Sequence, residues 1–402
     1  MAEPLIIIGN GMAATRLVEE LAARALGRYA VAVIGEEPRL AYNRVLLSSV
    51  LAQESSLEDI SLKPAEWWRN RGVTLRYGCA VQSVDVGART VMLADGKALG
   101  FSKLVFATGS RPIRLSLPGS DLPGVINFRD TADVAALSAI ARPGTRITVI
   151  GGGLLGLEAA YGLRKSGAEV TLVHLMDRLM ERQLDARAST MLKRAVEALG
   201  IDVHLSAKSE RIEGEARVEA LTLADGRRIP ADIVVFAVGI APNIALARDA
   251  GLATARGILV DDGLESSVRG IYGIGECIEH RKCCYGLVEP AYEQARVLAR
   301  NLAGEGASYA GSVLATNLKV SGVQVFSAGD FLGGPGTEEI VFSDPGPGTY
   351  KKLVLRDGRL VGAVLYGDTA DGLWYLELIR SGASVESLRG DFIFGRALAE
   401  AA

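Results

Sequence analysis

A glycine-rich segment occurs twice in this chain of 402 residues, each time directly after a short apolar run. The first copy has the sequence GNGMAA at residues 9–14, and the second has the sequence GGGLLG at residues 151–156. Each copy is followed further along by the tetrapeptide LADG and then by an apolar strand that ends in glycine. The interval between LADG and that glycine is the same in both copies. The chain therefore contains an internal duplication, which predicts two domains of the same type.

Each glycine-rich segment lies between a predicted strand and a predicted helix, as a dinucleotide-binding turn does. The first glycine of such a turn permits a tight bend, the second lets the backbone approach a pyrophosphate, and the third allows close helix packing. The first copy has Ala14 in the third place, whereas the second copy is complete; a turn that binds no ligand is the alternative. The expected contact residues are Gly9, Gly11, Met12 and Ala13 in the first copy and Gly151, Gly153, Leu154, Leu155 and Gly156 in the second.

The residue after the next strand differs between the two copies. Glu36 follows the apolar strand of the first copy and is expected to accept the hydroxyls of a ribose. The second copy has His174 there instead, with Arg178 and Arg182 further along. An acid at this position selects against a 2′-phosphate, whereas His and Arg can accept one. A purely packing role for His174 is the alternative, and the choice between NADH and NADPH stays open.

The order of predicted elements favours an α/β protein with two Rossmann-like domains and a small α+β domain at the C-terminal end. Helical patterns cover residues 12–26 and 289–303. From Tyr309 onward the pattern changes to alternating strands and turns, including a hairpin turn at Asp357-Gly358. This change predicts a separate third domain.

Composition excludes several classes of function. The net charge is −3 with acids and bases interspersed, so we expect no nucleic-acid partner. No apolar run approaches the ~18 residues of a membrane span, and residues 1–4 are too short for a signal sequence, so we expect no membrane association. The few cysteines fit a reducing cytoplasm rather than a disulfide scaffold. They are Cys79, Cys277, Cys283 and Cys284.

Two dinucleotide sites on one chain imply two cofactors whose reactive rings meet. A nicotinamide beside a flavin is the chemically sensible pair, because a flavin accepts a hydride as two electrons and can release them singly. Neither a nucleophile nor a metal is required for this transfer. The residues therefore predict an oxidoreductase.

Longer motifs carry a more specific resemblance. Residues 37–49 (EPRLAYNRVLLSS), 174–185 (HLMDRLMERQLD) and 274–277 (IGEC), with the second glycine segment, resemble the FAD-binding part of bacterial assimilatory nitrite reductase large subunits. They are also similar to the electron-transfer subunit of assimilatory nitrate reductase. Both belong to the pyridine nucleotide-dependent flavoprotein oxidoreductases, the superfamily of glutathione reductase and ferredoxin reductases.

The resemblance implies FAD on the first copy, NADH or NADPH on the second, and a glutathione reductase-like fold. It also implies a discontinuous FAD-binding domain, because the segment after residue 244 returns to the first domain. The implied domains are residues 1–115 with 245–308 for FAD, residues 116–244 for NAD(P)H, and residues 309–402 as a C-terminal interface domain.

The same resemblance assigns roles along the FAD. Arg44 and Ser48 would lie along its diphosphate and ribityl chain, Val81 would meet the adenine, and Glu276 would hold the ribityl chain. The helix that begins near Glu289 would direct its N-terminal dipole at the flavin pyrimidine ring. The closing strands would supply Ala107, Thr108 and Gly109 to the first site and Gly239 to the second.

The chain also departs from the family pattern. Glu158 resembles the glutamate that borders the nicotinamide, but Ser49 stands where ferredoxin reductases have a lysine. Lys319 is the candidate substitute for that lysine. Neither CxxC nor CxxxxC occurs, so thiol chemistry is not expected.

Three functions follow as hypotheses. In the first, NAD(P)H reduces FAD, and the flavin passes electrons to a separate redox protein of nitrate or nitrite assimilation. Without a cysteine-rich iron-sulfur and siroheme region, the chain is not expected to reduce nitrite alone. In the second, the acceptor is rubredoxin or ferredoxin. In the third, the chain is a redox sensor without turnover. A homodimer formed through the C-terminal domain remains open.

Overall fold

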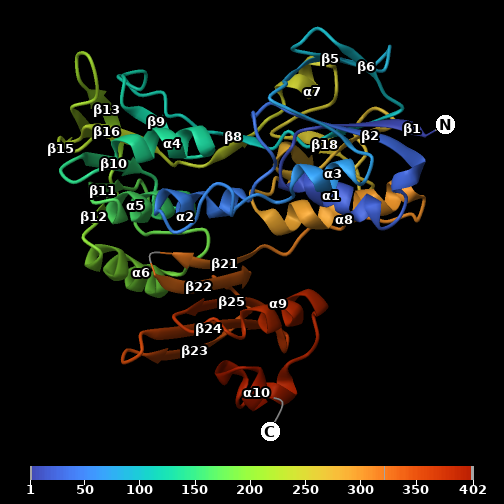
Figure 1. The fold of residues 1–402 in the computed structure, drawn as a ribbon. Coiled ribbons are helices and arrows are strands. Elements are labelled where there is room, and N and C mark those ends of the chain that lie inside the picture. The colour runs from blue at the N-terminus through green and yellow to red at the C-terminus, as the bar shows by residue number, and fades with distance from the viewer. Residues whose placement is uncertain (1, 321, 400–402) are drawn as a thin grey trace. The chain divides into compact units, whose positions relative to one another are not determined.

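The computed structural model describes residues 2–320 and 322–399, without the side chains of residues 318–320. The chain forms two compact units (Figure 1). Unit 1 comprises Met1–Leu47, Ser55–Arg111 and Ile240–Ser312, and unit 2 comprises Ser48–Glu54, Pro112–Gly239 and Val313–Ala402. Within the described ranges, no helix is both long and apolar enough to cross a bilayer.

A five-stranded parallel sheet with the order β19-β7-β1-β2-β3 forms the centre of unit 1. Its strands are β1 (Glu3–Ile8), β2 (Tyr29–Gly35), β3 (Thr74–Tyr77), β7 (Lys103–Phe106) and β19 (Ile271–Gly273). The last four residues of β1 are apolar and buried, as expected for a strand that is covered on both faces. Helices α1 (Met12–Ala22) and α8 (Val288–Ala303) pack against each other and bury Leu17, Leu21 and Leu298 in the same core.

The remaining elements of unit 1 are short. Strands β4, β5 and β6 form an antiparallel meander whose last turn is the first LADG segment, with Gly96 at φ 82°. The bounds are η1 (Leu26–Arg28), η2 (Arg44–Leu46), α3 (Ala65–Arg69), β4 (Val81–Asp85), β5 (Thr90–Leu93), β6 (Ala98–Gly100), α7 (Ala245–Asp249), β18 (Ile258–Val260), η3 (Gly275–Cys277) and β20 (Ile278–His280). The chain passes between the units at β8 (Ser110–Pro112) and β17 (Ile240–Pro242).

Unit 2 contains a second parallel sheet, with the order β12-β11-β10-β16-β9. Its strands are β9 (Val125–Asn127), β10 (Arg146–Ile150), β11 (Glu169–Val173), β12 (Asp202–His204) and β16 (Ile233–Phe236). Its helices are α2 (Leu47–Leu51), α4 (Thr131–Ile140), α5 (Leu154–Lys165) and α6 (Ala186–Ala198). A second meander, of β13 (Ser209–Glu213), β14 (Ala220–Leu223) and β15 (Arg228–Pro230), ends on the second LADG turn, where Gly226 has φ 87°.

The rest of unit 2 is an antiparallel sheet with the order β21-β22-β25-β24-β23. Its elements are β21 (Ala315–Val320), β22 (Val323–Gly329), β23 (Glu338–Asp344), β24 (Thr349–Arg356), β25 (Arg359–Tyr366), α9 (Gly372–Ser381), η4 (Glu386–Leu388), η5 (Phe392–Phe394) and α10 (Arg396–Ala399). Tyr375 and Phe392 pack edge to face in its core, at 5.5 Å between ring centroids. Asp357 and Gly358 join β24 to β25 with φ of 50° and 67°, which confirms the predicted turn.

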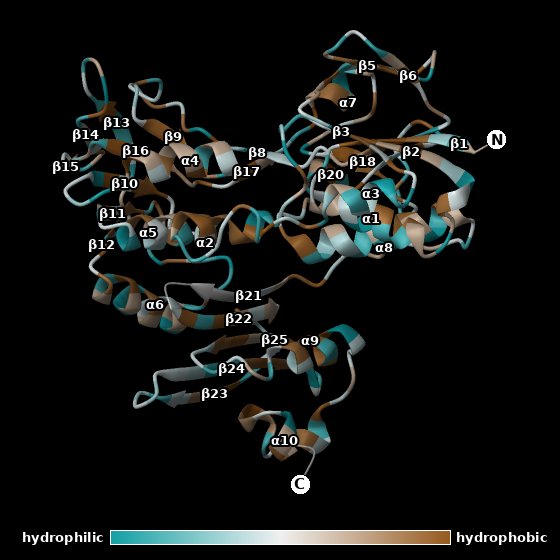
Figure 2. Cartoon of the chain, in the orientation of Figure 1, coloured by the Kyte–Doolittle hydropathy of each residue, from teal (hydrophilic) through white to brown (hydrophobic). Residues whose placement is uncertain are grey.

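Hydropathy distinguishes the sheet from the helices in unit 1. Figure 2 shows β1 and β2 mainly in hydrophobic colours, whereas α1 and α8 carry both hydrophilic and hydrophobic residues. The predicted helix 289–303 is confirmed as α8, but the helix expected over residues 12–26 ends at Ala22. After Ala22 the amides of Arg24 and Ala25 both donate to the carbonyl of Leu21, and the chain turns so that Leu26 packs on the core.

Candidate functional site

The first glycine segment is held against the strand that closes its sheet. The amide of Gly9 donates to the carbonyl of Ile34 at 2.7 Å, and the amide of Ala107 donates to Ile8 at 2.8 Å. Gly9 has φ 114°, and a Cβ there would lie only 2.1 Å from the carbonyl oxygen of Ala107. No other residue type fits this position, because both the backbone conformation and the neighbouring carbonyl exclude a side chain.

The second glycine segment repeats this geometry in unit 2. Gly151 has φ 125°, its amide donates to Val173 at 2.8 Å, and a Cβ there would lie 2.3 Å from the carbonyl oxygen of Ala237. At the third position, a Cβ on Gly156 would lie 1.8 Å from the carbonyl oxygen of Gly151. The duplication seen in the sequence is therefore a duplication of backbone contacts.

The second glycine of each segment faces open space. Gly11 and Gly153 are the N-cap residues of α1 and α5, and a Cβ on either would meet no atom within 4 Å. Neither helix has a side-chain cap, whereas Asp130 caps α4 and Asp185 caps α6. The first-turn amides of α1 and α5, which include those of Met12, Ala13, Leu154 and Leu155, are thus available to an anion.

The end of β2 presents two acids with different surroundings. Glu37 accepts a hydrogen bond from Tyr42 at 2.7 Å and pairs closely with Arg44, whose guanidinium also lies over the Tyr42 ring. Glu36 is exposed and forms no hydrogen bond or ion pair with the rest of unit 1 that the structure describes. Glu36 is therefore the acid that remains able to accept ribose hydroxyls.

The closing strand and η3 contribute further polar groups to the same end of unit 1. Thr108 donates to the carbonyl of Asn243 at 2.8 Å, and Ser110 donates to Glu276 at 2.8 Å. Gly109 has φ 64°, as a residue does where the chain turns sharply after a strand.

The first turn of α1 lies next to η3. A Cβ on Gly275 would be 3.1 Å from the Cβ of Ala13, and the Gly275 amide donates at 2.7 Å to Gln294, which is fully buried on α8. The predicted residue Ala13 thus lies next to Gly275, the residue that precedes Glu276. Val81 begins β4 and is half-buried; the structure assigns it no further contact that bears on its predicted role.

At the end of β11 in unit 2, His174 is buried and turned toward the glycine segment. Its Nδ1 accepts the amide of Gly152 at 2.9 Å, and its Nε2 lies 3.1 Å from Glu181. Arg182 is exposed, whereas Arg178 is half-buried and contacts Asp177 at 3.4 Å. Sequence reasoning missed Glu181, because the irregular segment after β11 gives no period from which to place a side chain seven residues on.

Glu158 and Ser48 also meet in unit 2, although the sequence had suggested different ligands for them. The Ser48 hydroxyl is hydrogen-bonded to the Glu158 carboxyl, yet burial outweighs this bond and raises the pKa of Glu158 to about 8. Ser49 is half-buried on the same short helix, α2. Lys319 belongs to β21, which contacts α5, but its side chain lies outside the described part of the structure.

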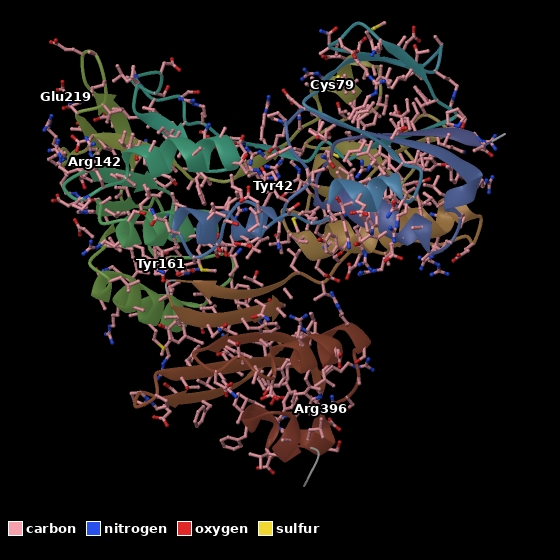
Figure 3. All side chains as sticks on the ribbon, viewed as in Figure 1. Tyr42, Cys79, Arg142, Tyr161, Glu219 and Arg396 are labelled. Atoms are coloured by element: carbon pink, nitrogen blue, oxygen red, sulfur yellow. The ribbon has the colours of Figure 1, made fainter. Side chains whose placement is uncertain are left out.

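The cysteines are free thiols distributed over unit 1. Cys79 is half-buried on the loop between β3 and β4 (Figure 3). Cys277 is fully buried and contacts the carbonyls of Phe106 and Ile274, and burial raises the pKa of its thiol. These surroundings favour a packing rather than a redox role for Cys277.

The residues present fit two dinucleotides. Each predicted site, here called a cradle, has three features. They are a glycine at which a Cβ would clash with the closing strand, a helix N-terminus without a side-chain cap, and a glycine after the closing strand, Gly109 or Gly239. The first site adds Glu36, Arg44 and Glu276, and the Oδ1 atom of Asn10 is buried there without a hydrogen-bond partner among the described residues.

Comparisons with known proteins agree with this geometry. Residues 3–296 match the model of the family described as pyridine nucleotide-disulphide oxidoreductase, and residues 315–383 match the rubredoxin NAD+ reductase C-terminal domain. The chain is 44% identical over 95% of its length to the nitrite reductase [NAD(P)H] of Bacillus subtilis, and 39% identical over 91% to the assimilatory nitrate reductase electron transfer subunit of the same organism. It spans 48% of the length of each. The crystal structure of a ferredoxin reductase from Rhodopseudomonas palustris is similar over 95% of both chains, with 27% identity and a TM-score of 0.88.

Proposed function

The chain belongs to the pyridine nucleotide-disulphide oxidoreductase family, whose cofactors are FAD and NAD(P)H, and we propose that it is an electron-transfer reductase of nitrate or nitrite assimilation. In this role it takes electrons from NAD(P)H and passes them through FAD to a partner redox protein. The observation that carries the proposal is the duplicated cradle, in which Gly9 and Gly151 each abut the carbonyl of a closing strand.

The chemistry that bound FAD supplies is acceptance of a hydride as two electrons and release of those electrons singly. The residues of this chain bind the two dinucleotides and orient them. Gly11 and Gly153 leave room for two pyrophosphates, and Glu36 accepts ribose hydroxyls. Glu276, oriented by Ser110, and Arg44, oriented by Glu37, bind along the FAD. Glu158 holds a proton on its carboxyl group at neutral pH.

The resemblance of the whole chain to the two Bacillus subtilis proteins supports an acceptor in nitrogen assimilation. A second candidate acceptor is rubredoxin or ferredoxin. The match of residues 315–383 to a rubredoxin reductase domain and the likeness to the Rhodopseudomonas palustris ferredoxin reductase favour it.

The test is anaerobic titration of the purified yellow protein with NADH and with NADPH, monitored by bleaching of the flavin absorption. We expect stoichiometric bleaching by at least one nucleotide and steady reduction of ferricyanide in its presence. A protein that stays colourless after incubation with excess FAD, or whose flavin neither nucleotide bleaches, contradicts the proposal.

Two alanine variants separate the two sites without disturbing the fold. Gly11 and Gly153 have φ values that alanine tolerates, and a methyl group there meets no protein atom. We expect Gly11→Ala to be folded but deficient in FAD, and Gly153→Ala to retain FAD that NAD(P)H reduces poorly, because the methyl group enters the space of the pyrophosphate. Gly27→Ala, where a Cβ is equally unhindered, is the matched control and should behave as wild type.

A further inference from the structure

The ribose-binding acid expected at the end of β11 is absent, and the segment after the strand supplies an acid by another route. We propose that Glu181, held in place by His174, accepts the adenosine ribose hydroxyls of the pyridine nucleotide and makes the second site selective for NADH over NADPH. This inference rests on the proposed function and names the specificity of the same site.

The segment that carries Glu181 is anchored to the glycine loop through both polar groups of Gly152. The Gly152 amide donates to His174 Nδ1 at 2.9 Å, and the Gly152 carbonyl accepts the amide of Met180 at 3.0 Å. A Cβ on Gly152 would lie 2.6 Å from the His174 ring and 2.8 Å from Leu179. The segment that contains Leu179 and Met180 therefore packs against the glycine loop, next to the N-terminus of α5 at which the pyrophosphate is proposed to bind. Glu181 directly follows Met180, which anchors this segment to the loop.

The hydrogen bonds of His174 determine what its ring can do. Since Nδ1 accepts from a backbone amide, the proton of the neutral imidazole is on Nε2, from which it points to Glu181 Oε2 at 3.1 Å. His174 is buried and both its nitrogens are engaged, so it is a positioning residue rather than a group that binds a phosphate. The imidazole of His174, at the end of β11, thus holds the carboxylate of Glu181 in place through a hydrogen bond.

Glu181 retains the capacity to bind a ligand. Its side chain is 23% exposed, and only Oε2 is hydrogen-bonded within the described part of unit 2, so Oε1 is free to accept a ribose hydroxyl. A 2′-phosphate at the same place would meet a like charge, which weakens the binding of NADPH relative to NADH. Arg182 is the competing group, because its exposed guanidinium makes no ion pair with the described residues and could accept that phosphate.

Calorimetric titration of the FAD-loaded full chain with NAD+ and with NADP+ measures this specificity without turnover. We expect wild type to bind NAD+ at least roughly tenfold more tightly than NADP+. Glu181→Gln keeps an oxygen that accepts from His174 and places an NH2 group that can donate to a ribose hydroxyl where Oε1 was, but it removes the charge. The affinity for NADP+ should therefore rise about tenfold with little change for NAD+. Glu181→Ala should lose affinity for NAD+ by about tenfold, because a charge-assisted hydrogen bond is lost.

Two controls make the result specific. Glu169→Gln removes an exposed acid from the opposite end of β11 and should leave the NAD+/NADP+ ratio of dissociation constants unchanged. Arg182→Ala should also leave it unchanged. Equal affinity of wild type for both nucleotides, a ratio unaffected by Glu181→Gln, or a selective loss of NADP+ binding in Arg182→Ala overturns the inference. If neither nucleotide binds wild type, the proposed function itself fails.

Discussion

The carboxyl group of Glu158 makes the stability of unit 2 depend on pH in a defined direction. Burial raises its pKa from 4.5 to about 8, so the folded protein binds this proton more tightly than the unfolded chain does. Between those two pH values the folded state holds more protons, and the contribution of Glu158 to stability falls as pH rises. Below about pH 4.5 the ionisation of Glu158 costs no stability, and above about pH 8 the full cost of burying the charged carboxylate is present.

We therefore expect Glu158→Gln to become progressively more stable than wild type as the pH is raised from about 5 to about 8, by at most ~1.4 kcal/mol per pH unit, with a constant difference above that. Thermal melting of both proteins across this range measures the effect. Glu197→Gln, on the exposed face of α6, should melt in parallel with wild type. A difference between wild type and Glu158→Gln that is independent of pH would contradict the raised pKa.

The third position of the glycine segment shows how the two copies diverged. Ala14 is buried without conflict, whereas a Cβ on Gly156 would lie 1.8 Å from the carbonyl oxygen of Gly151. We expect Gly156→Ala to lower the stability of unit 2 by about 1 to 3 kcal/mol or more, because backbone must move to admit the methyl group. The reciprocal change Ala14→Gly should cost only about 1 kcal/mol, through helix propensity. Chemical denaturation of the two variants gives the comparison, and equal losses would refute it.

At the scale of elements, the side chain of Asp185 links helix α6 to strand β24 of the C-terminal antiparallel sheet within unit 2. Asp185 caps α6 by accepting the amide of Ala188 at 2.9 Å, and its other oxygen accepts the hydroxyl of Tyr350, on β24, at 2.5 Å. Both residues are buried, and burial, followed by the bond to Asp185, raises the pKa of Tyr350. A hydrogen bond to a charged acceptor in such a place stabilises more than an exposed one.

We expect Tyr350→Phe to lower the free energy of unfolding of unit 2 by about 1.5 to 3 kcal/mol, because Asp185 then keeps a single partner for its buried carboxylate. Chemical denaturation followed by circular dichroism measures the loss. Tyr366→Phe is the matched control, since Tyr366 is also buried in this sheet but its hydroxyl has no hydrogen-bond partner in the described structure. Equal destabilisation by both variants would show that the Asp185 bond contributes nothing.

The turns could be predicted because their signals are local. The glycine segments, the LADG turns and the Asp357-Gly358 turn each require a backbone conformation that few residues other than glycine adopt, so the sequence indicates them directly. Contacts that depend on how elements pack cannot be predicted from such local signals. The carbonyl of Leu21 that ends α1 by accepting two amides, and the Ser48 bond to Glu158, depend on how elements pack. The proposed division into three domains stays a prediction, and so do the individual ligand contacts.

At the scale of the whole molecule, the two glycine-rich domains account for the electron donor, NAD(P)H, and for the FAD that it reduces. The acceptor that oxidises the flavin remains to be identified. The chain spans 48% of the nitrite reductase and of the nitrate reductase electron transfer subunit of Bacillus subtilis. Its net charge of −3 provides no strong field that would steer a highly acidic or highly basic partner. Selectivity among acceptors must then come from local surface complementarity rather than from overall charge.

We accordingly expect that the purified chain, supplied with NADH, reduces the catalytic part of an assimilatory nitrate or nitrite reductase with a kcat/KM at least about tenfold above that for rubredoxin or ferredoxin. Because overall charge contributes little, this preference should change by less than about threefold between low and moderate ionic strength. Nucleotide-dependent reduction of each acceptor, measured at equal ferricyanide activity, provides the comparison. Faster transfer to rubredoxin or ferredoxin would assign the chain to the second candidate function, and a steep salt dependence would locate the selectivity in charged patches instead.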